Sequence, residues 1–292
     1  MTLQVKYDAW GSSRQQRRCD VNYSLTGTKR PCIAAHRGSC GGNIPPNTSI
    51  AFEAALKQGA GLIETDIARS SDGIFYLFHT GNELKHLGFD GIFEETPSSV
   101  LDTLRLRNEF GNATQYRLDR FEDILEQFKG RCLINLDRCW QDWQEVIPII
   151  ESHGMREQII LKSPCKKIWM DKVKEVASAY AYMPIINEDI SSFFDLGGAD
   201  IPGFIGAELV FSSESSPIIT DNIAWMLRKA GKHAWGNAIQ FSQQKILSAG
   251  HNDDVSIMES PDKGWGWLID KGFDIIQTDW VAILNSYLTS RL

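Results

Sequence analysis

The stretch IAAHRG at residues 33–38, taken together with LIETD at residues 62–66, decides the fold. Both are short apolar runs that end on side chains capable of acid, base or metal chemistry: His36 in the first, Glu64 and Asp66 in the second. Runs that are apolar on consecutive positions are typical of strands covered on both faces, as in a parallel sheet. Since the strands of a parallel barrel present their carboxyl ends at one mouth, we expect these side chains to line one site.

Strand-like and helix-like patterns alternate along most of the chain. Residues 118–128 place apolar side chains on one helical face, and residues 48–58 begin at the cap residue Thr48 and are followed by Gly59. This alternation predicts an α/β fold, specifically a (β/α)8 TIM barrel. The sequence offers nine candidate strands where such a barrel has eight, so one candidate is not a strand or lies outside the barrel. The candidates are 32–36, 62–66, 75–79, 132–137, 158–162, 182–186, 204–209, 233–236 and 274–278.

The connection between residues 66 and 75 is too short for a helix and contains the turn signal Asp72-Gly73. In an extended form it can run back along the barrel wall and keep 75–79 parallel to its neighbours. The alternative is an antiparallel hairpin. Residues 80–131 contain no convincing strand and are too many for a simple crossover. We expect them to form an insertion after the third strand, with one helix at its end, lying over the site.

Composition and charge narrow the class of protein. The 292 residues are 42% hydrophobic, and the formal net charge is -7. An acidic chain without a long basic block offers no electrostatic attraction to nucleic acid or to an anionic membrane. No apolar run reaches the roughly 18 residues of a membrane helix, and the first residues do not form a signal peptide. We expect a soluble, cytoplasmic protein with no integral membrane segment; a secreted or periplasmic protein that has lost its leader is the alternative.

The chain divides into two expected parts. Residues 1–30 are polar and irregular and are predicted to form an N-terminal arm, whereas residues 31–292 form a single catalytic barrel domain. The six cysteines include no CxxC pair and no spacing typical of a zinc site. The oligomeric state stays open.

A carboxylate pair indicates a metal site. Glu64 and Asp66 are two positions apart on a strand, so their side chains face the same way. Two carboxylates held together repel, and one takes up a proton unless a cation lies between them. Mg²⁺ and Ca²⁺ are divalent ions that prefer oxygen ligands. Asp137, which ends another largely apolar strand, is the expected third ligand.

Two histidines supply proton transfer. His36 and His79 each follow a strand, and imidazole titrates near neutral pH, so the pair can serve as general acid and base. The planar guanidinium of Arg37 suits a phosphate. With a divalent ion to neutralise the phosphate charge, these residues predict the cleavage of a small phosphodiester. One histidine would take the proton of the nucleophile and the other would protonate the leaving oxygen.

The order of these motifs resembles the glycerophosphodiester phosphodiesterase family of phospholipase C-like TIM barrels. The likeness is dense over residues 33–79. It is weaker at 133–137, 233–237 and 275–279. Family members use a divalent ion, two histidines and three carboxylates to split glycerophosphodiesters into an alcohol and glycerol 3-phosphate. The motifs are His36-Arg37-Gly38, Pro46-Asn47-Thr48, Ala51-Phe52, Glu64-x-Asp66, Asp72-Gly73 and His79.

The resemblance implies the role of each core residue. His36 and His79 become the acid and base, and the metal ligands become Glu64, Asp66 and Asp137.

Substrate contacts are less sharply indicated. The resemblance makes Arg37 a phosphate contact. Lys162, at a strand end, either binds the phosphate or is solvated, and Trp235 either packs under the substrate or fills the rim. Glu208 is either a further carboxylate of the site or part of a rim ion pair, of which we expect the second, and Asp279 is expected to fix a loop. The histidines expected to be structural or at the surface are His86, His153, His233 and His251.

Three departures from the family pattern concern the substrate. Pro46 stands where the family has Glu, and Thr80 stands where it has Asp. A Glu-x-Lys strand end is replaced by Asp137-Arg138-Cys139, so Lys162 or Arg138 would have to replace the lost lysine. Two alternatives therefore remain: a phospholipase C/D-like phosphodiesterase that forms a cyclic phosphate, and a non-catalytic barrel that binds phosphorylated ligands.

Overall fold

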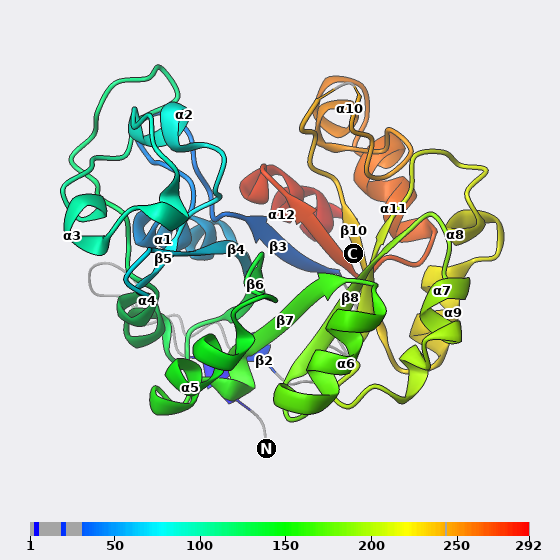
Figure 1. Ribbon diagram of the computed structural model, residues 1–292. Coiled ribbons are helices and arrows are strands. Elements are labelled where there is room, and N and C mark those ends of the chain that lie inside the picture. The colour runs from blue at the N-terminus through cyan, green and yellow to red at the C-terminus, as the bar shows by residue number, and fades with distance from the viewer. Residues whose placement is uncertain (1–2, 6–18, 22–30, 243, 292) are drawn as a thin grey trace.

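The computed structural model describes residues 3–5, 19–21, 31–242 and 244–291 and confirms the (β/α)8 barrel (Figure 1). Its parallel strands pair in the order β3-β11-β10-β9-β8-β7-β6-β4, and β4 pairs with β3 to close the circle. Each overlaps an expected strand. They are β3 (Cys32–His36), β4 (Leu62–Arg69), β6 (Leu133–Asp137), β7 (Ile159–Pro164), β8 (Ala181–Asn187), β9 (Gly206–Val210), β10 (His233–Asn237) and β11 (Ile275–Thr278).

Capping residues and apolar periodicity explain two of the helices, α1 and α4. In α1 (Ser49–Gln58), Thr48 Oγ1 accepts a hydrogen bond from the Ala51 N–H, and Gly59 ends the helix at a φ of 103°. In α4 (Phe121–Phe128) the apolar face predicted from the sequence is buried. The other helices are α2 (Glu83–Leu87), η1 (Phe93–Glu95), α3 (Ser98–Leu101), α5 (Trp143–Ser152), η2 (Arg156–Gln158), α6 (Lys167–Val176), α7 (Ser191–Asp195), η3 (Gly198–Asp200), α8 (Pro217–Thr220), α9 (Ile223–Lys229), α10 (Asp253–Met258), η4 (Asp262–Gly266), α11 (Trp267–Asp270) and α12 (Val281–Ser290).

The extra strand lies outside the parallel barrel. β5 (Phe75–Leu77) pairs antiparallel with the extension of β4, with Arg69 opposite Phe75. The hairpin is therefore correct and a parallel strand at 75–79 is wrong. The turn is closed by a hydrogen bond from the Ser70 N–H to the Ile74 carbonyl. Gly73 adopts a φ of 89° in this turn, a conformation that favours glycine. The insertion consequently follows the second barrel strand rather than the third.

The segment after this hairpin has a small core of its own. Tyr76, Phe78, Phe93 and Leu101 are among the residues that pack there, apart from the main core. In Figure 1 this segment, with α2 and α3, stands at one side of the barrel mouth, whereas α10 stands at the opposite side. The helix expected at the end of the insertion is α4, whose apolar face packs in the main barrel core.

Of the predicted N-terminal arm, the structure describes only β1 (Leu3–Val5) and β2 (Cys19–Val21), which pair antiparallel. The remainder of residues 1–30 lies outside the described residues. Within the part of the chain that is described, no helix combines the length and apolar character needed to cross a membrane.

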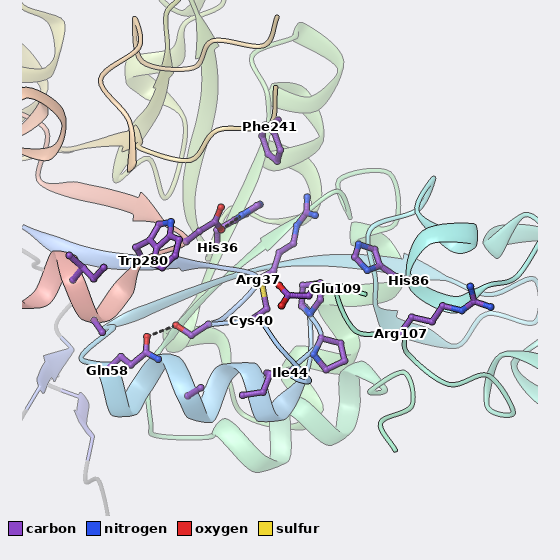
Figure 2. A pocket seen from close by; sticks show the side chains of 18 of the residues that line it. His36, Arg37, Cys40, Ile44, Gln58, His86, Arg107, Glu109, Phe241 and Trp280 are labelled. Atoms are coloured by element: carbon purple, nitrogen blue, oxygen red, sulfur yellow. Dashed lines mark hydrogen bonds and ion pairs between the residues drawn. The ribbon is translucent and has the colours of Figure 1, made fainter. Parts of the chain in front are cut away.

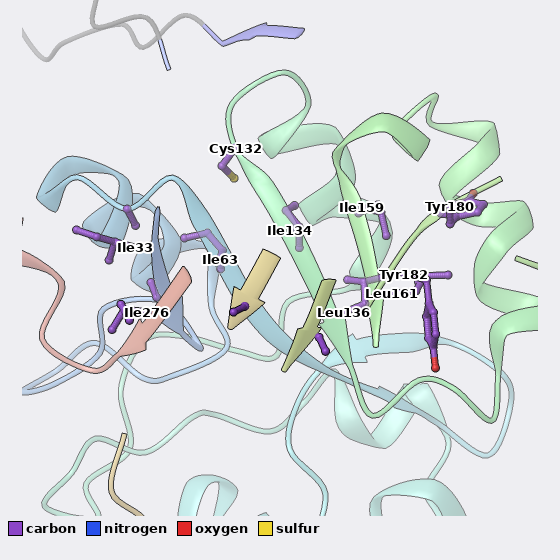
Figure 3. Close-up of a cluster of buried hydrophobic side chains, with 14 of the residues drawn as sticks. Ile33, Ile63, Cys132, Ile134, Leu136, Ile159, Leu161, Tyr180, Tyr182 and Ile276 are labelled. Atoms are coloured by element: carbon purple, nitrogen blue, oxygen red, sulfur yellow. The ribbon is translucent and has the colours of Figure 1, made fainter. Parts of the chain in front are cut away.

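Alternation along each strand decides which side chains reach the barrel interior. On β4, Ile63 packs outward in the main core (Figure 3), whereas Leu62 belongs to the cluster inside the barrel. Glu64 and Asp66 lie two and four positions beyond Leu62 and therefore face inward, near the mouth. Asp137 ends β6 directly beside Asp66. The prediction that the two carboxylates of β4 face the same way is confirmed.

Candidate active site

Three acidic side chains meet at the carboxyl ends of β4 and β6. Each of Glu64, Asp66 and Asp137 offers an oxygen, and these oxygens lie within 4.8 Å of one another. Glu64 is 3% exposed and Asp66 is 2% exposed. Within the described residues this is the one such group of three acidic, histidine or cysteine side chains.

The charge of this carboxylate cluster is only partly balanced by the protein, through Arg37 and Lys162. Burial, and then the neighbouring charges of Asp66 and Asp137, raise the pKa of Glu64 well above its usual value. Burial and Asp66 likewise raise the pKa of Asp137 to about 6. Like charges in a water-poor site favour either protonation or a bound cation. Because all the donors are carboxylate oxygens, the cluster fits a hard divalent ion.

Two residues of the loop after β3 tie the cluster to the backbone. Arg37 Nε lies 2.8 Å from Asp66 Oδ2, although its N–H is not aimed at that oxygen, and the Arg37 backbone N–H donates to Glu64 Oε2. Asn47 Nδ2 donates to Asp66 Oδ2 at 3.0 Å, while Asn47 Oδ1 accepts from Thr65 Oγ1 and from the Asp66 backbone. The Pro-Asn-Thr motif had indicated Asn47 without a role; its amide holds Asp66 in place.

His36 is held by a carboxylate from the far end of the chain. Its Nδ1 lies 2.8 Å from Oδ1 of Asp279, the residue directly after β11, and its ring makes a T-shaped contact with Phe241, the centroids 5.5 Å apart. Since a carboxylate accepts, Nδ1 is the protonated nitrogen and Nε2 is available for chemistry. Asp279 was expected to fix a loop, and sequence reasoning missed its contact with His36.

His79 lies in the loop after β5, in a different environment. Its Nδ1 is 2.9 Å from the Thr80 carbonyl, and Arg138 Nη1 lies 3.2 Å from its Nε2. Partial burial lowers the pKa of His79, an effect that the nearby charge of Asp66 opposes and that Arg138 reinforces. The ring is therefore biased toward its neutral form.

Lys162 and Trp235 lie deeper in the barrel. Lys162 is 1% exposed, its Nζ is 2.6 Å from Glu208 Oε2, and it stands 3.1 Å from the centroid of the Trp235 ring. Trp235 donates in turn to Asn237 and Gln277. A solvated Lys162 is therefore wrong, and the expected ion pair of Glu208 is found.

A cavity of about 900 Å³ opens beside the histidine of β3 (Figure 2). His36 and Arg37 line it on the barrel side, and Phe241 and Trp280 border it from the later loops. His86, which had been expected to be structural or at the surface, lines it from the insertion. The insertion, which was expected to lie over the site, thus borders this cavity.

Two family models match the chain. Residues 36–136 match the glycerophosphoryl diester phosphodiesterase family, and residues 182–288 match a domain of unknown function. The first match begins at His36 and includes Glu64, Asp66 and His79; it ends at Leu136, one residue before Asp137.

Curated relatives match over short stretches. The chain is 46% identical over 55 residues to glycerophosphodiester phosphodiesterase GDPD6 of Arabidopsis thaliana, which is 19% of this chain and 14% of that protein. It is 27% identical over 130 residues to the uncharacterized protein YqiK of Bacillus subtilis (strain 168), 44% of this chain and 50% of that protein. The chain thus spans half or less of the length of these relatives.

Solved structures match over nearly the whole chain. A glycerophosphoryl diester phosphodiesterase of Parabacteroides distasonis has a TM-score of 0.75 at 18% identity, with 93% of this chain and 91% of that chain covered. A phosphodiesterase of Oleispira antarctica, solved with its product sn-glycerol-3-phosphate, has a TM-score of 0.66 at 18% identity, covering 89% and 97%. Likeness at this identity shows a shared fold. Over residues 36–136 the chain is therefore similar to the glycerophosphoryl diester phosphodiesterase family, and its barrel has the fold of the solved structures that carry that name.

Proposed function

We propose that the protein is a metal-dependent hydrolase that splits glycerophosphodiesters into glycerol 3-phosphate and an alcohol. The observation that carries this proposal is the buried carboxylate cluster of Glu64, Asp66 and Asp137, with His36 and His79 beside it. The product bound to the Oleispira antarctica phosphodiesterase, which shares the fold, supports the choice of substrate.

The carboxylate cluster would hold the ion. Mg²⁺ or Ca²⁺, when bound, would neutralise charge on the phosphate. Asn47 and Arg37 keep Asp66 oriented toward it, and the guanidinium of Arg37 has further N–H donors for phosphate oxygens.

The two histidines divide the proton transfers. His79 is biased toward the neutral form and suits the base, which removes a proton from the attacking water. His36 is then the acid, which protonates the leaving alcohol oxygen through Nε2, because Asp279 occupies Nδ1. The positive charge of the buried Lys162 opposes the rise in the pKa of Glu64 and of Asp137 and so eases their mutual repulsion.

Turnover of glycerophosphocholine and of bis(p-nitrophenyl) phosphate, with Mg²⁺, Ca²⁺, Mn²⁺ or EDTA, tests the proposal. Metal-dependent hydrolysis that is lost in His36→Ala and Glu64→Ala, but retained in Asp171→Asn on the outer face of α6, would support it. No turnover with any metal would favour a barrel that only binds phosphorylated ligands.

Phosphorus NMR of the products distinguishes the remaining alternative. Direct release of glycerol 3-phosphate agrees with the proposal, whereas a cyclic phosphate would show that an internal hydroxyl of the substrate is the nucleophile.

A further inference from the structure

A buried aspartate in the second half of the chain has no part in the chemistry above. Asp253 is the first residue of α10, in the long segment between β10 and β11, and is 2% exposed. An aspartate in the first turn of a helix ordinarily interacts with that helix and with water. The side chain of Asp253 instead points into the protein, where burial would be costly without partners.

Three donors converge on this carboxylate. Asp253 Oδ1 accepts from Trp265 Nε1 and from Thr278 Oγ1, each at 2.7 Å. Its Oδ2 accepts from the backbone N–H of Asp279 at 2.9 Å. Two of the three donors therefore belong to the carboxyl end of β11 rather than to the surroundings of α10.

The backbone held in this way carries the side chain that orients His36. Asp279 Oδ1 lies 2.8 Å from His36 Nδ1, yet the Asp279 side chain is 41% exposed and so is weakly restrained by packing. Thr278 Oγ1 also accepts from the backbone N–H of Trp280, so the turn from β11 into α12 is held on both sides of Asp279. Fixing this backbone fixes where the Asp279 carboxylate can reach.

We propose that Asp253 is a positioning residue for His36, acting through the backbone of Asp279. The inference rests on the proposed function, in which His36 transfers a proton. It also gives the region matched only by a domain of unknown function a part in the reaction, since residues 182–288 include Asp253 and Asp279.

Asp253→Asn is the decisive variant. Both carboxylate oxygens face donors, so the amide must turn its own N–H₂ group toward one of them. We expect kcat on glycerophosphocholine to fall about 10–100-fold, the usual cost of losing an outer hydrogen-bond partner. KM should change less than about threefold, because Asp253 does not touch the substrate.

A second readout does not depend on activity. In the parent protein, at a pH where the His36 ring is neutral, ¹⁵N NMR of the imidazole should show its proton on Nδ1, and Asp253→Asn should produce a mixture of tautomers or a new ring signal. The His36 signal is assigned by its loss in His36→Gln.

Three further variants separate positioning from general stability. Thr278→Val removes one hydroxyl donor with little change of shape and should lower kcat and disturb the His36 signal, even if Asp253→Asn fails to fold. Trp265→Phe removes the donor that does not belong to β11 and should have little effect on the ring. The matched control is Asp254→Asn, the exposed neighbour of Asp253 in the same helix, which should behave as the parent.

Unchanged kcat and unchanged His36 signals in folded Asp253→Asn would overturn the inference. A raised KM at constant kcat would overturn it as well, because it would place Asp253 in binding. If the parent hydrolyses no diester, the proposed function fails, while the NMR signals still decide whether Asp253 positions the ring.

Discussion

The two sides of the barrel mouth hold charge in opposite ways. At the ends of β4 and β6, the carboxylates of Glu64, Asp66 and Asp137 crowd together with too little positive charge. Further round the barrel, Glu208 is paired with Lys162. Both sets are buried, so burial alone does not mark the site. Uncompensated charge identifies the side that needs a ligand, and compensated charge identifies the side that acts as scaffold.

Glu64→Gln removes one carboxylate of the cluster and should have the largest effect on activity. Loss of one metal ligand should lower kcat/KM at least about 10³-fold, equivalent to roughly 4 kcal/mol of transition-state stabilisation. Without metal the variant should be more stable than the parent, because a repelling charge has been removed. Thermal unfolding with and without Mg²⁺ or Ca²⁺ measures this.

The contrast fails if Glu64→Gln loses stability in EDTA. In that case the carboxylate would be satisfied by the protein itself, and no cation would be needed to hold the cluster together.

Removing each histidine compares the two proton-transfer positions. His36→Gln and His79→Gln should each lower kcat about 10²–10⁴-fold with small changes in KM, as expected for acid and base groups. Each variant should remove one limb of the pH–rate profile. His79→Gln should remove the acidic limb, because the base must be deprotonated to act, and His36→Gln should remove the alkaline limb, because the acid must be protonated. Loss of the same limb in both variants would contradict the division of roles.

Lys162→Met tests the compensated side. The substitution leaves Glu208 buried without its cation, and we expect a loss of about 3–5 kcal/mol in the free energy of unfolding. Adding Glu208→Gln should restore most of that stability. Chemical denaturation of the single and double variants measures both.

Activity of the stable double variant then decides the role of Lys162. Near-parental kcat/KM would make it scaffold, whereas activity that stays low would make it a phosphate ligand.

The raised pKa values of the carboxylate cluster predict how its affinity for a metal ion depends on pH. Burial and Asp66 raise the pKa of Asp137 to about 6, so protons compete with the ion as the pH falls below that value. Affinity for Mg²⁺ or Ca²⁺ should be nearly constant above about pH 7 and should fall up to about tenfold per unit below pH 6. Calorimetric titration at several pH values tests this, and an affinity independent of pH would show that Asp137 is not a ligand.

The sequence was sufficient for the barrel and for the carboxylate cluster, because both follow from strand periodicity. Consecutive apolar positions identify the barrel strands, and the two-residue spacing of Glu64 and Asp66 puts them on one face. The direction of β5 was not predictable, since it depends on hydrogen bonds of the Ser70 turn. Asp253 left no signal either, because one of its contacts at the end of β11 is a backbone N–H, which no residue pattern records.

The smallest effect concerns His86, which lines the cavity beside the carboxylate cluster. Burial, followed by the charges of Lys85 and Arg37, lowers the pKa of His86 to about 4. Between about pH 6.5 and pH 4 the unfolded chain therefore binds a proton at His86 that the folded protein does not bind. This contribution to the free energy of unfolding is fully present above about pH 6.5 and is lost as the pH falls toward 4.

Because the His86 side chain is only partly buried, solvent screening should limit the loss to about 1–2 kcal/mol. His86→Gln should remove this part of the acid sensitivity and leave stability at pH 8 nearly unchanged, measured by urea unfolding at both pH values. His153→Gln, at the C-cap of α5, is the matched control and should leave the parental dependence of stability on pH unchanged. If the stability of His86→Gln depends on pH as the parent's does, the His86 side chain is open to water, and the charges of Lys85 and Arg37 do not act on it.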